Sequence, residues 1–157
     1  MEYNRRAVIE YAQQWALKRN PQYYDFEYIG GDCTNFVSQC IFAGARVMNY
    51  TPIYGWYYRF LSDRTPSWSG VKYLYDFLVN NKSAGPFACE VEKQAIQPGD
   101  VIQLGRSDGR FYHTLIVTEI FPEILVCAHS YDALDRSLSS YDYEVARCLH
   151  IDGVRAY

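Results

Sequence analysis

Apolar residues repeat at helical spacing in the first half of this 157-residue chain, and short apolar runs of strand length replace that pattern in the second half. The helical spacing predicts helices over residues 5–19, 33–44 and 71–78. The short runs, which are bounded by turn residues, predict strands over residues 101–104, 111–120, 124–128 and 145–151. Helices followed by strands are typical of α+β proteins, so we expect N-terminal helices packed on an antiparallel β-sheet.

Residues 45–69 show no periodicity and are rich in aromatic residues, which predicts a long loop of the kind that often lines a binding site. A turn-rich connection through Gly85 and Pro86 ends the helical half. The chain has the length of one ordinary domain, and it contains no repeat and no linker. We therefore expect a single domain over residues 1–157.

Composition and charge exclude several classes of function. The net charge of −3 provides no basic surface for nucleic acid. No apolar run reaches the roughly 18 residues of a membrane span, and the N-terminus has no run of signal-peptide length. The chain as written is predicted to be a cytoplasmic monomer, but a chain whose leader had been removed would have the same sequence, so the localisation stays open.

The cysteines argue against a disulfide framework and against a metal site. Their number is odd, and no two of them form a Cys-x-x-Cys pair. At least one thiol is therefore free, which suits a reducing compartment or an enzyme that depends on a reduced thiol. The sequence predicts no metal and no other cofactor. The five residues are Cys33, Cys40, Cys89, Cys127 and Cys148.

The segment GGDCTNFVSQ, residues 30–39, places Cys33 in the first turn of a predicted helix, directly after an acidic residue and two glycines. Unpaired N–H groups and the positive end of the helix dipole favour the thiolate at such a position. The glycines let a substrate carbonyl approach the backbone, and the N–H group of Cys33 is placed to stabilise an oxyanion. Cys33 is therefore the candidate nucleophile. The alternative is a buried structural residue, the role that we expect for the other cysteines.

A cysteine nucleophile needs a base, and the chain offers three histidines. His113 begins the run HTLIVT after a polar loop, which places it near a strand end with Leu115 and Val117 on its own face. His113 is therefore the candidate general base. The alternative is a structural histidine with both ring nitrogens hydrogen bonded.

A third polar group should hold the imidazole of His113 in the correct tautomer. If residues 122–123 form a two-residue hairpin loop, strand pairing puts Asp132 opposite His113. A longer or bulged turn brings His129 there instead. The residues leave both possibilities open, and His150 on the last predicted strand is a weaker candidate.

Several motifs together resemble the putative amidase domain family of bacteria. The GDCTNFVSQ stretch is long and specific, and the similarity extends over nearly the whole chain. That family is similar in outline to the NlpC-like and CHAP cell-wall peptidases, which implies a papain-like fold. The motifs are Asn20-Pro21 followed by Tyr23, GDCTNFVSQ, Trp68-Ser69-Gly70, Gln97-Pro98-Gly99-Asp100, His113, and His129 through Asp132.

The resemblance implies roles for the reacting residues. Cys33 and His113 correspond to the nucleophile on a helix N-terminus and the base on a strand. His129 stands in the place of the third catalytic residue, at the end of the strand after the base. The resemblance thus favours His129, while the register of a two-residue turn favours Asp132, and we keep both.

The resemblance also suggests the groups that bind substrate. Tyr23 lies upstream of the cysteine, as an oxyanion donor does in the NlpC-like enzymes, with Tyr24 and Tyr28 as rivals. Trp68 and Asp32 are assigned, with Tyr23, to the part of the site that binds the oxyanion and the substrate. Asp32 is expected to act as a helix cap and supporting group rather than as a reactant.

The resulting hypothesis is a cysteine amidase or peptidase, and bacterial cell-wall (peptidoglycan) peptides are the substrate class that the resemblance implies. Cys33 attacks, His113 transfers the proton and water resolves the thioester. An acyltransferase that uses the same residues is one alternative. A non-catalytic module whose aromatic loops bind a glycan or peptide is the other.

Overall fold

The computed structural model describes residues 1–157 and has an α+β architecture. Its helices are α1 (Arg5–Trp15), α2 (Cys33–Ala45), α3 (Pro66–Ser69) and α4 (Val71–Asn80). Its strands are β1 (Tyr58–Phe60), β2 (Asp63–Arg64), β3 (Gly85–Val91), β4 (Val101–Gly105), β5 (Phe111–Glu119), β6 (Leu125–Ala128), β7 (Ala133–Ser137) and β8 (Val145–Arg155). Two short 3-10 helices are η1 (Lys93–Ala95) and η2 (Leu138–Ser140).

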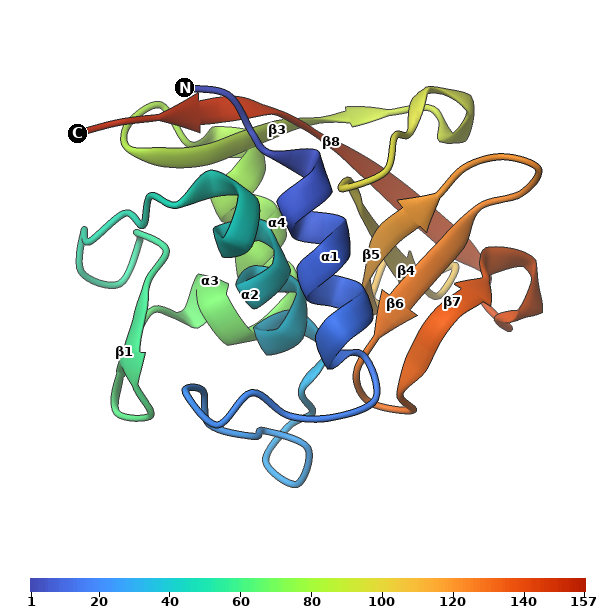
Figure 1. Ribbon diagram of the computed structural model, residues 1–157, viewed down its shortest axis with the longest axis horizontal. Helices are drawn as coiled ribbons and strands as arrows, with labels where there is room; N and C mark the ends of the chain where they lie inside the picture. The colour runs from blue at the N-terminus through green and yellow to red at the C-terminus, as the bar shows by residue number, and fades with distance from the viewer.

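Six strands form one antiparallel sheet in the order β3-β8-β4-β5-β6-β7. Helices α1, α2 and α4 lie together against this curved sheet, and the two chain ends meet beside β8 (Figure 1). The N-terminal amino group of Met1 donates to the carbonyl of Val154 at 3.0 Å. Strands β1 and β2 form a separate hairpin.

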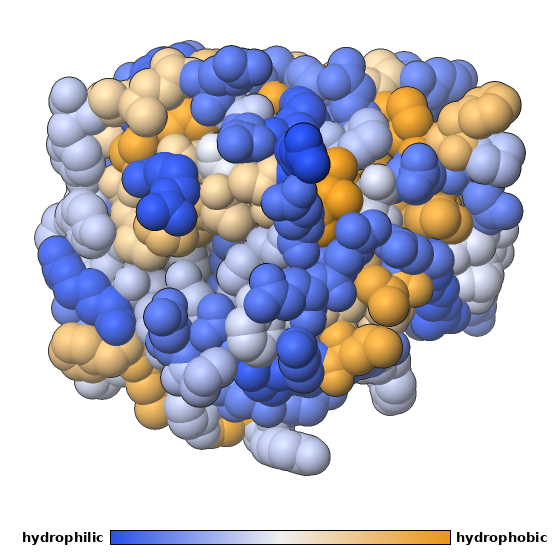
Figure 2. All heavy atoms as spheres, viewed as in Figure 1, coloured by the Kyte–Doolittle hydropathy of each residue, from blue (hydrophilic) through white to orange (hydrophobic).

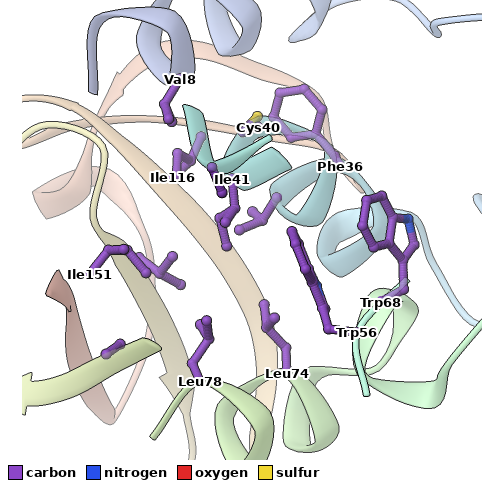
Figure 3. Close-up of a cluster of buried hydrophobic side chains, with 14 of the residues drawn as sticks. Val8, Phe36, Cys40, Ile41, Trp56, Trp68, Leu74, Leu78, Ile116 and Ile151 are labelled. Carbon is purple, nitrogen blue, oxygen red and sulfur yellow. The ribbon is translucent and has the colours of Figure 1, made fainter. Parts of the chain in front are cut away.

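The apolar side chains form two clusters that lie on opposite faces of the sheet. Alternation along β5 explains the division, because Ile116 belongs to the cluster beneath the helices and Leu115 and Val117 belong to the other. By the same alternation Thr114 faces the helices and His113 faces the second cluster. The largest buried members of the first cluster include Phe36, Ile41, Trp56, Trp68, Leu74 and Leu78 (Figure 3).

The three predicted helices and the four predicted strands are all present, with changes at their ends. The first helix ends at Trp15 rather than at residue 19. The carbonyl of Trp15 accepts from the N–H group of Lys18 at 3.3 Å, which closes a turn, and from the ring of His129, far away in the sequence, at 2.8 Å. A tighter turn and a tertiary contact therefore take the place of the last predicted helical turn.

Strands β3 and β7, the hairpin and helix α3 were not predicted. Strand β3 begins at Gly85-Pro86, the pair that indicates a turn in the sequence. Proline is tolerated here because β3 is an edge strand that pairs only with β8. The segment predicted as one irregular loop, residues 45–69, contains the β1–β2 hairpin and α3.

Polar and apolar side chains are interspersed over the face of the molecule in Figure 2, without one continuous apolar patch. None of the helices combines the length and the apolar character that crossing a bilayer requires.

Candidate active site

Helix α2 begins at Cys33, as predicted, after a turn that two glycines make possible. Gly30 (φ 86°) and Gly31 (φ 97°) both adopt the left-handed backbone that glycine tolerates best. The N–H group of Cys33 has no hydrogen-bond partner. An unpaired N–H group at a helix N-terminus is a donor that an oxyanion can use.

Asp32 precedes the helix, but its side chain makes no cap hydrogen bond, so the prediction of a helix cap is wrong. Oδ1 accepts from the N–H group of Phe26 and from Nδ2 of Asn35, each at 2.8 Å. Oδ2 lies 2.5 Å from Nδ1 of His129. Both oxygens are engaged and the residue is 1% exposed, so Asp32 supports the loop before Cys33 and is closed to a substrate.

The sulfur of Cys33 lies beside β5, at a level where β6 has already ended. N–H groups along β5 point alternately towards β4 and β6. The N–H group of Val117 donates to the carbonyl of Asp100 beside β4. Because Thr114 lies three residues earlier on the strand, its N–H group points to the opposite side, towards β6. It finds no strand partner there, and it faces Sγ of Cys33 instead. On the helix side, Oγ1 of Thr34 lies 3.7 Å from the same sulfur.

The surroundings of Cys33 favour a thiol in the resting protein. Burial raises the pKa of the Cys33 thiol, and the carboxylate of Asp32 raises it further. The donors supplied by Thr114 and Thr34 lower this pKa, but they do not cancel the effect of burial. The predicted preference for the thiolate is therefore not found, because the loss of solvent at a residue that is 8% exposed outweighs the donors around the sulfur.

His113 directly precedes Thr114, and its ring centroid lies 6.0 Å from that of Tyr141. Burial, together with the nearby charge of Arg136, lowers the pKa of His113 to about 4. The ring is therefore neutral at neutral pH. Of the three histidines, only His113 has both ring nitrogens free of hydrogen bonds. A neutral imidazole with a free nitrogen is what a general base requires.

His129 lies on the helix side of the sheet, and its polar atoms are fully occupied. Its ring stacks on Phe36 with a centroid separation of 4.0 Å. Nδ1 pairs with Asp32, and Nε2 donates to the carbonyl of Trp15 at 2.8 Å. Neither nitrogen is available to orient His113, so this geometry gives the predicted orienting role no support.

Asp132 also lies away from the place that the two-residue turn assigned to it. A longer loop joins β5 and β6, and the register shifts with it. The carboxylate of Asp132 pairs with the guanidinium of Arg19 at 2.8 Å. His150, the weaker candidate, is bonded through Nδ1 to Asp100 at 2.8 Å. None of the three candidates is free to hold the imidazole of His113.

Trp68 and Tyr23 lie in the aromatic packing beside α2. Trp68 is fully buried among the apolar side chains of Figure 3. Its Nε1 donates to Oδ1 of Asn35 at 3.0 Å. It therefore holds the helix that carries Cys33 and cannot contact a substrate. The ring of Tyr23 stacks on Trp68 with a centroid separation of 6.0 Å. The oxyanion role of Tyr23 stays a prediction.

Two features of the site were not predicted from the sequence. The hydroxyl of Tyr141 is buried without a partner near His113. The hydroxyls of Thr34 and Thr114 lie 2.9 Å apart beside the sulfur. Thr34 directly follows Cys33 in the sequence, so its hydroxyl could have been expected near the sulfur. Nothing in the sequence indicates that Tyr141 lies near His113.

The other cysteines agree with the predicted structural role in three of four cases. Cys40, Cys127 and Cys148 are buried, and Cys40 points into the main core (Figure 3). Burial raises the pKa of Cys127 to about 12. Cys89 is exposed on the edge strand β3, where its thiol donates to the carboxylate of Asp152 at 3.6 Å.

Comparison with known proteins agrees with the family resemblance. The family described as "Putative amidase domain" matches residues 2–151. The chain is 37% identical over 147 residues to a protein of Bacillus subtilis (strain 168) described as "Uncharacterized protein YhbB". This similarity covers 90% of the chain and 46% of the relative, so the chain spans about half of the relative's length. No solved structure matches the chain.

Proposed function

Because this chain belongs to the putative amidase domain family, we propose that it is a cysteine hydrolase that cleaves an amide bond in bacterial cell-wall peptides. Cys33 is the nucleophile and His113 the general base, in a papain-like arrangement similar to that of the NlpC-like and CHAP peptidases. One observation carries the proposal. The sulfur faces the N–H group of Thr114 at the edge of β5, beyond the end of β6, and the residue directly before Thr114 is the one histidine with a free ring. The ring of His113 points to the other face of the sheet, so in the proposed reaction it meets the sulfur around this open edge of β5.

A neutral thiol and a neutral imidazole determine the order of the proton transfers. His113 takes the thiol proton as Sγ attacks the carbonyl carbon, and the N–H group of Cys33 donates to the developing oxyanion. The imidazolium then gives this proton to the leaving amine as the C–N bond breaks, which leaves a thioester on Cys33. Water, activated by the same imidazole, hydrolyses the thioester to a carboxylic acid and restores the thiol.

The lowered pKa of His113 affects the two transfers in opposite ways. An imidazolium that burial destabilises gives its proton readily to the leaving amine. The same burial makes it harder for His113 to take the proton from Cys33. Donors that stabilise the thiolate are therefore most useful in the first step. Catalytic hydrogen bonds that are long in the free enzyme commonly shorten once substrate is bound.

The test is incubation with purified cell-wall peptides, followed by mass spectrometry. We expect the wild-type protein to yield two fragments that together have gained one water molecule. Cys33→Ala should lower turnover by at least about 10³-fold. Its free energy of unfolding should fall by only about 1 kcal/mol.

The matched control is Cys148→Ala, which removes the same atoms from the second cluster and should leave turnover unchanged. Full turnover in Cys33→Ala would exclude the proposed mechanism. A product that carries an added amine or alcohol in place of water would identify an acyltransferase.

A further inference from the structure

A row of hydrogen-bonded polar side chains ends at the sulfur of Cys33. At its far end, Nε of Arg147 donates to Oε1 of Gln103 at 2.8 Å. Nε2 of Gln103 donates to Oγ1 of Thr114 at 3.2 Å. Oγ1 of Thr114 lies 2.9 Å from that of Thr34, which lies 3.7 Å from Sγ.

The amide of Gln103 can take only one orientation in this row. Arg147 can only donate, so it must meet the amide oxygen. Nε2 also donates to the carbonyl of Val71 at 2.9 Å, and a carbonyl can only accept. A flipped amide would place two donors together at one end and two acceptors at the other. The hydroxyl oxygen of Thr114 therefore accepts from Gln103.

The direction of the two threonine hydroxyls follows from that of the amide. Each hydroxyl has one hydrogen to donate. The hydroxyl of Thr114 already accepts from Gln103, so it donates its hydrogen to its other partner, the hydroxyl of Thr34. Thr34 then accepts, and its hydrogen points to Sγ. In the reverse order, the hydrogen of Thr114 would be buried without a partner, because Thr114 is 0% exposed and Thr34 is 1% exposed.

We infer that Arg147, Gln103, Thr114 and Thr34 form a directional chain of donors that stabilises the thiolate of Cys33 when the base removes its proton. The inference rests on the proposed function, in which Cys33 is the nucleophile. Thr34 donates to the sulfur and does not accept from it, so the thiol proton stays free to leave for the base. Gln103 and Thr114 act through Thr34 and are positioning residues.

Arg147 supplies a fixed positive charge at the far end of the row. Its guanidinium carbon lies 3.6 Å from the ring centroid of Tyr75 and 3.9 Å from that of Phe111. These rings hold the guanidinium in the orientation that directs Nε to Gln103. A charge at one end of a chain of hydrogen bonds polarises each bond in the same direction, which makes the last donor stronger.

The test measures the thiolate of Cys33 directly. The rate of labelling by iodoacetamide follows the thiolate fraction, and mass spectrometry of the peptide that contains Cys33 separates it from the exposed Cys89. Thr34→Val replaces the hydroxyl by a methyl group of similar size. We expect it to raise the pH midpoint of labelling by about one unit, and so to slow labelling about tenfold at a fixed pH below the midpoint. Thr34→Ser restores the hydroxyl and should label like the wild-type protein.

Thr114→Val tests the row at a distance from the sulfur. Its N–H group still faces Sγ, so a loss of the hydroxyl alone can act only through Thr34. We expect a rise of the midpoint in the same direction, with a fall of kcat and little change in KM. The matched control is Thr118→Val on the same strand, whose buried hydroxyl donates to Asp135 at 2.7 Å outside the row. Its midpoint should stay that of the wild-type protein.

The inference is overturned if Thr34→Val and Thr114→Val leave the midpoint unchanged in protein that thermal unfolding shows to be folded. An equal shift in Thr118→Val overturns it as well. If either Thr34→Val or Thr114→Val does not fold, the labelling midpoint of the other variant decides whether the inference holds. Labelling needs no substrate, so the outcome is independent of the proposed function. Shifted midpoints together with an active Cys33→Ala protein would refute the hydrolase and leave the effect of the row on the sulfur in place.

Discussion

His113 and His129 come from neighbouring parts of one sheet, yet their polar surroundings are opposite. Around His129 the carboxylate of Asp32 and the carbonyl of Trp15 take both ring nitrogens. Around His113 the ring nitrogens are free, and the adjacent hydroxyl of Tyr141 is buried without a partner. Nε of Arg19, on the His129 side, is also buried without a hydrogen bond, but it lies 3.2 Å from the carboxylate of Asp25 and 3.7 Å from that of Asp32 and so has charge partners. Unpaired buried groups cost stability, so a fold retains them mainly where chemistry uses them. We interpret the His129 region as structural and the His113 region as reactive.

The largest expected effect comes from removing each histidine in turn. His113→Ala should lower turnover by about 10²- to 10⁴-fold, the usual contribution of a general base, and should leave most of the stability. His129→Ala should lower the free energy of unfolding by about 1–3 kcal/mol, because it removes the closest partner of the buried Asp32 carboxylate and leaves that oxygen only the more distant guanidinium of Arg19, at 3.7 Å. Kinetics on a cell-wall peptide and urea unfolding measure the two effects.

Asp132→Ala is the control for this comparison. Its partner is Arg19, and their side chains are 29% and 26% exposed, so the pair should contribute only about 0–1 kcal/mol. If Asp132→Ala damages turnover or stability more than His129→Ala, our division into a structural and a reactive region is wrong.

The next effect is the contribution of His113 to the dependence of the free energy of unfolding on pH. Its pKa is about 4 in the folded protein and 6.5 as its ordinary value. Between these pH values the unfolded chain binds a proton that the folded chain does not, so the contribution of His113 is complete above pH 6.5 and is lost as the pH falls towards 4. The loss should be on the order of 3 kcal/mol.

Urea unfolding at a series of pH values measures this dependence. His113→Gln has no titrating ring, so its free energy of unfolding should fall less between pH 6.5 and pH 4 than that of the wild-type protein. Equal slopes in the two proteins would show that the ring of His113 is solvated or hydrogen bonded.

The same contrast explains what the sequence could predict. The start of α2 at Cys33 and the strand that carries His113 follow from local signals, namely a glycine pair, helical spacing and strand alternation. The role of His129 could not be predicted, because its partners belong to segments about 100 residues away in the chain. The resting thiol of Cys33 was missed for a related reason. The helix dipole is local, whereas burial is a property of the whole fold.

The smallest expected effect concerns Tyr141, the unpaired group of the reactive region. The guanidinium of Arg136 lies over its ring, 3.8 Å from the centroid, and acts to lower the pKa of the hydroxyl, which burial raises, but it lies outside hydrogen-bond geometry. Removal of the hydroxyl ends its desolvation cost, so Tyr141→Phe should raise the free energy of unfolding by up to about 1 kcal/mol. We expect the hydroxyl to accept from the imidazolium of His113 during turnover, so kcat should fall about tenfold, the equivalent of one hydrogen bond.

Tyr11→Phe is the matched variant from the helix side of the sheet, where the tyrosine hydroxyl is paired. The hydroxyl of Tyr11 donates to Oε1 of Gln39 at 2.6 Å and accepts from Nδ2 of Asn20 at 3.1 Å. The same change of atoms should therefore lower the free energy of unfolding by about 1–3 kcal/mol, because it leaves Oε1 of Gln39 without its hydrogen-bond donor. It should leave kcat unchanged. A loss of stability in Tyr141→Phe as well would mean that its hydroxyl is paired in solution. A gain of stability with unchanged kcat would mean that the unpaired hydroxyl has no part in the chemistry, and that the free ring of His113 alone distinguishes the reactive side.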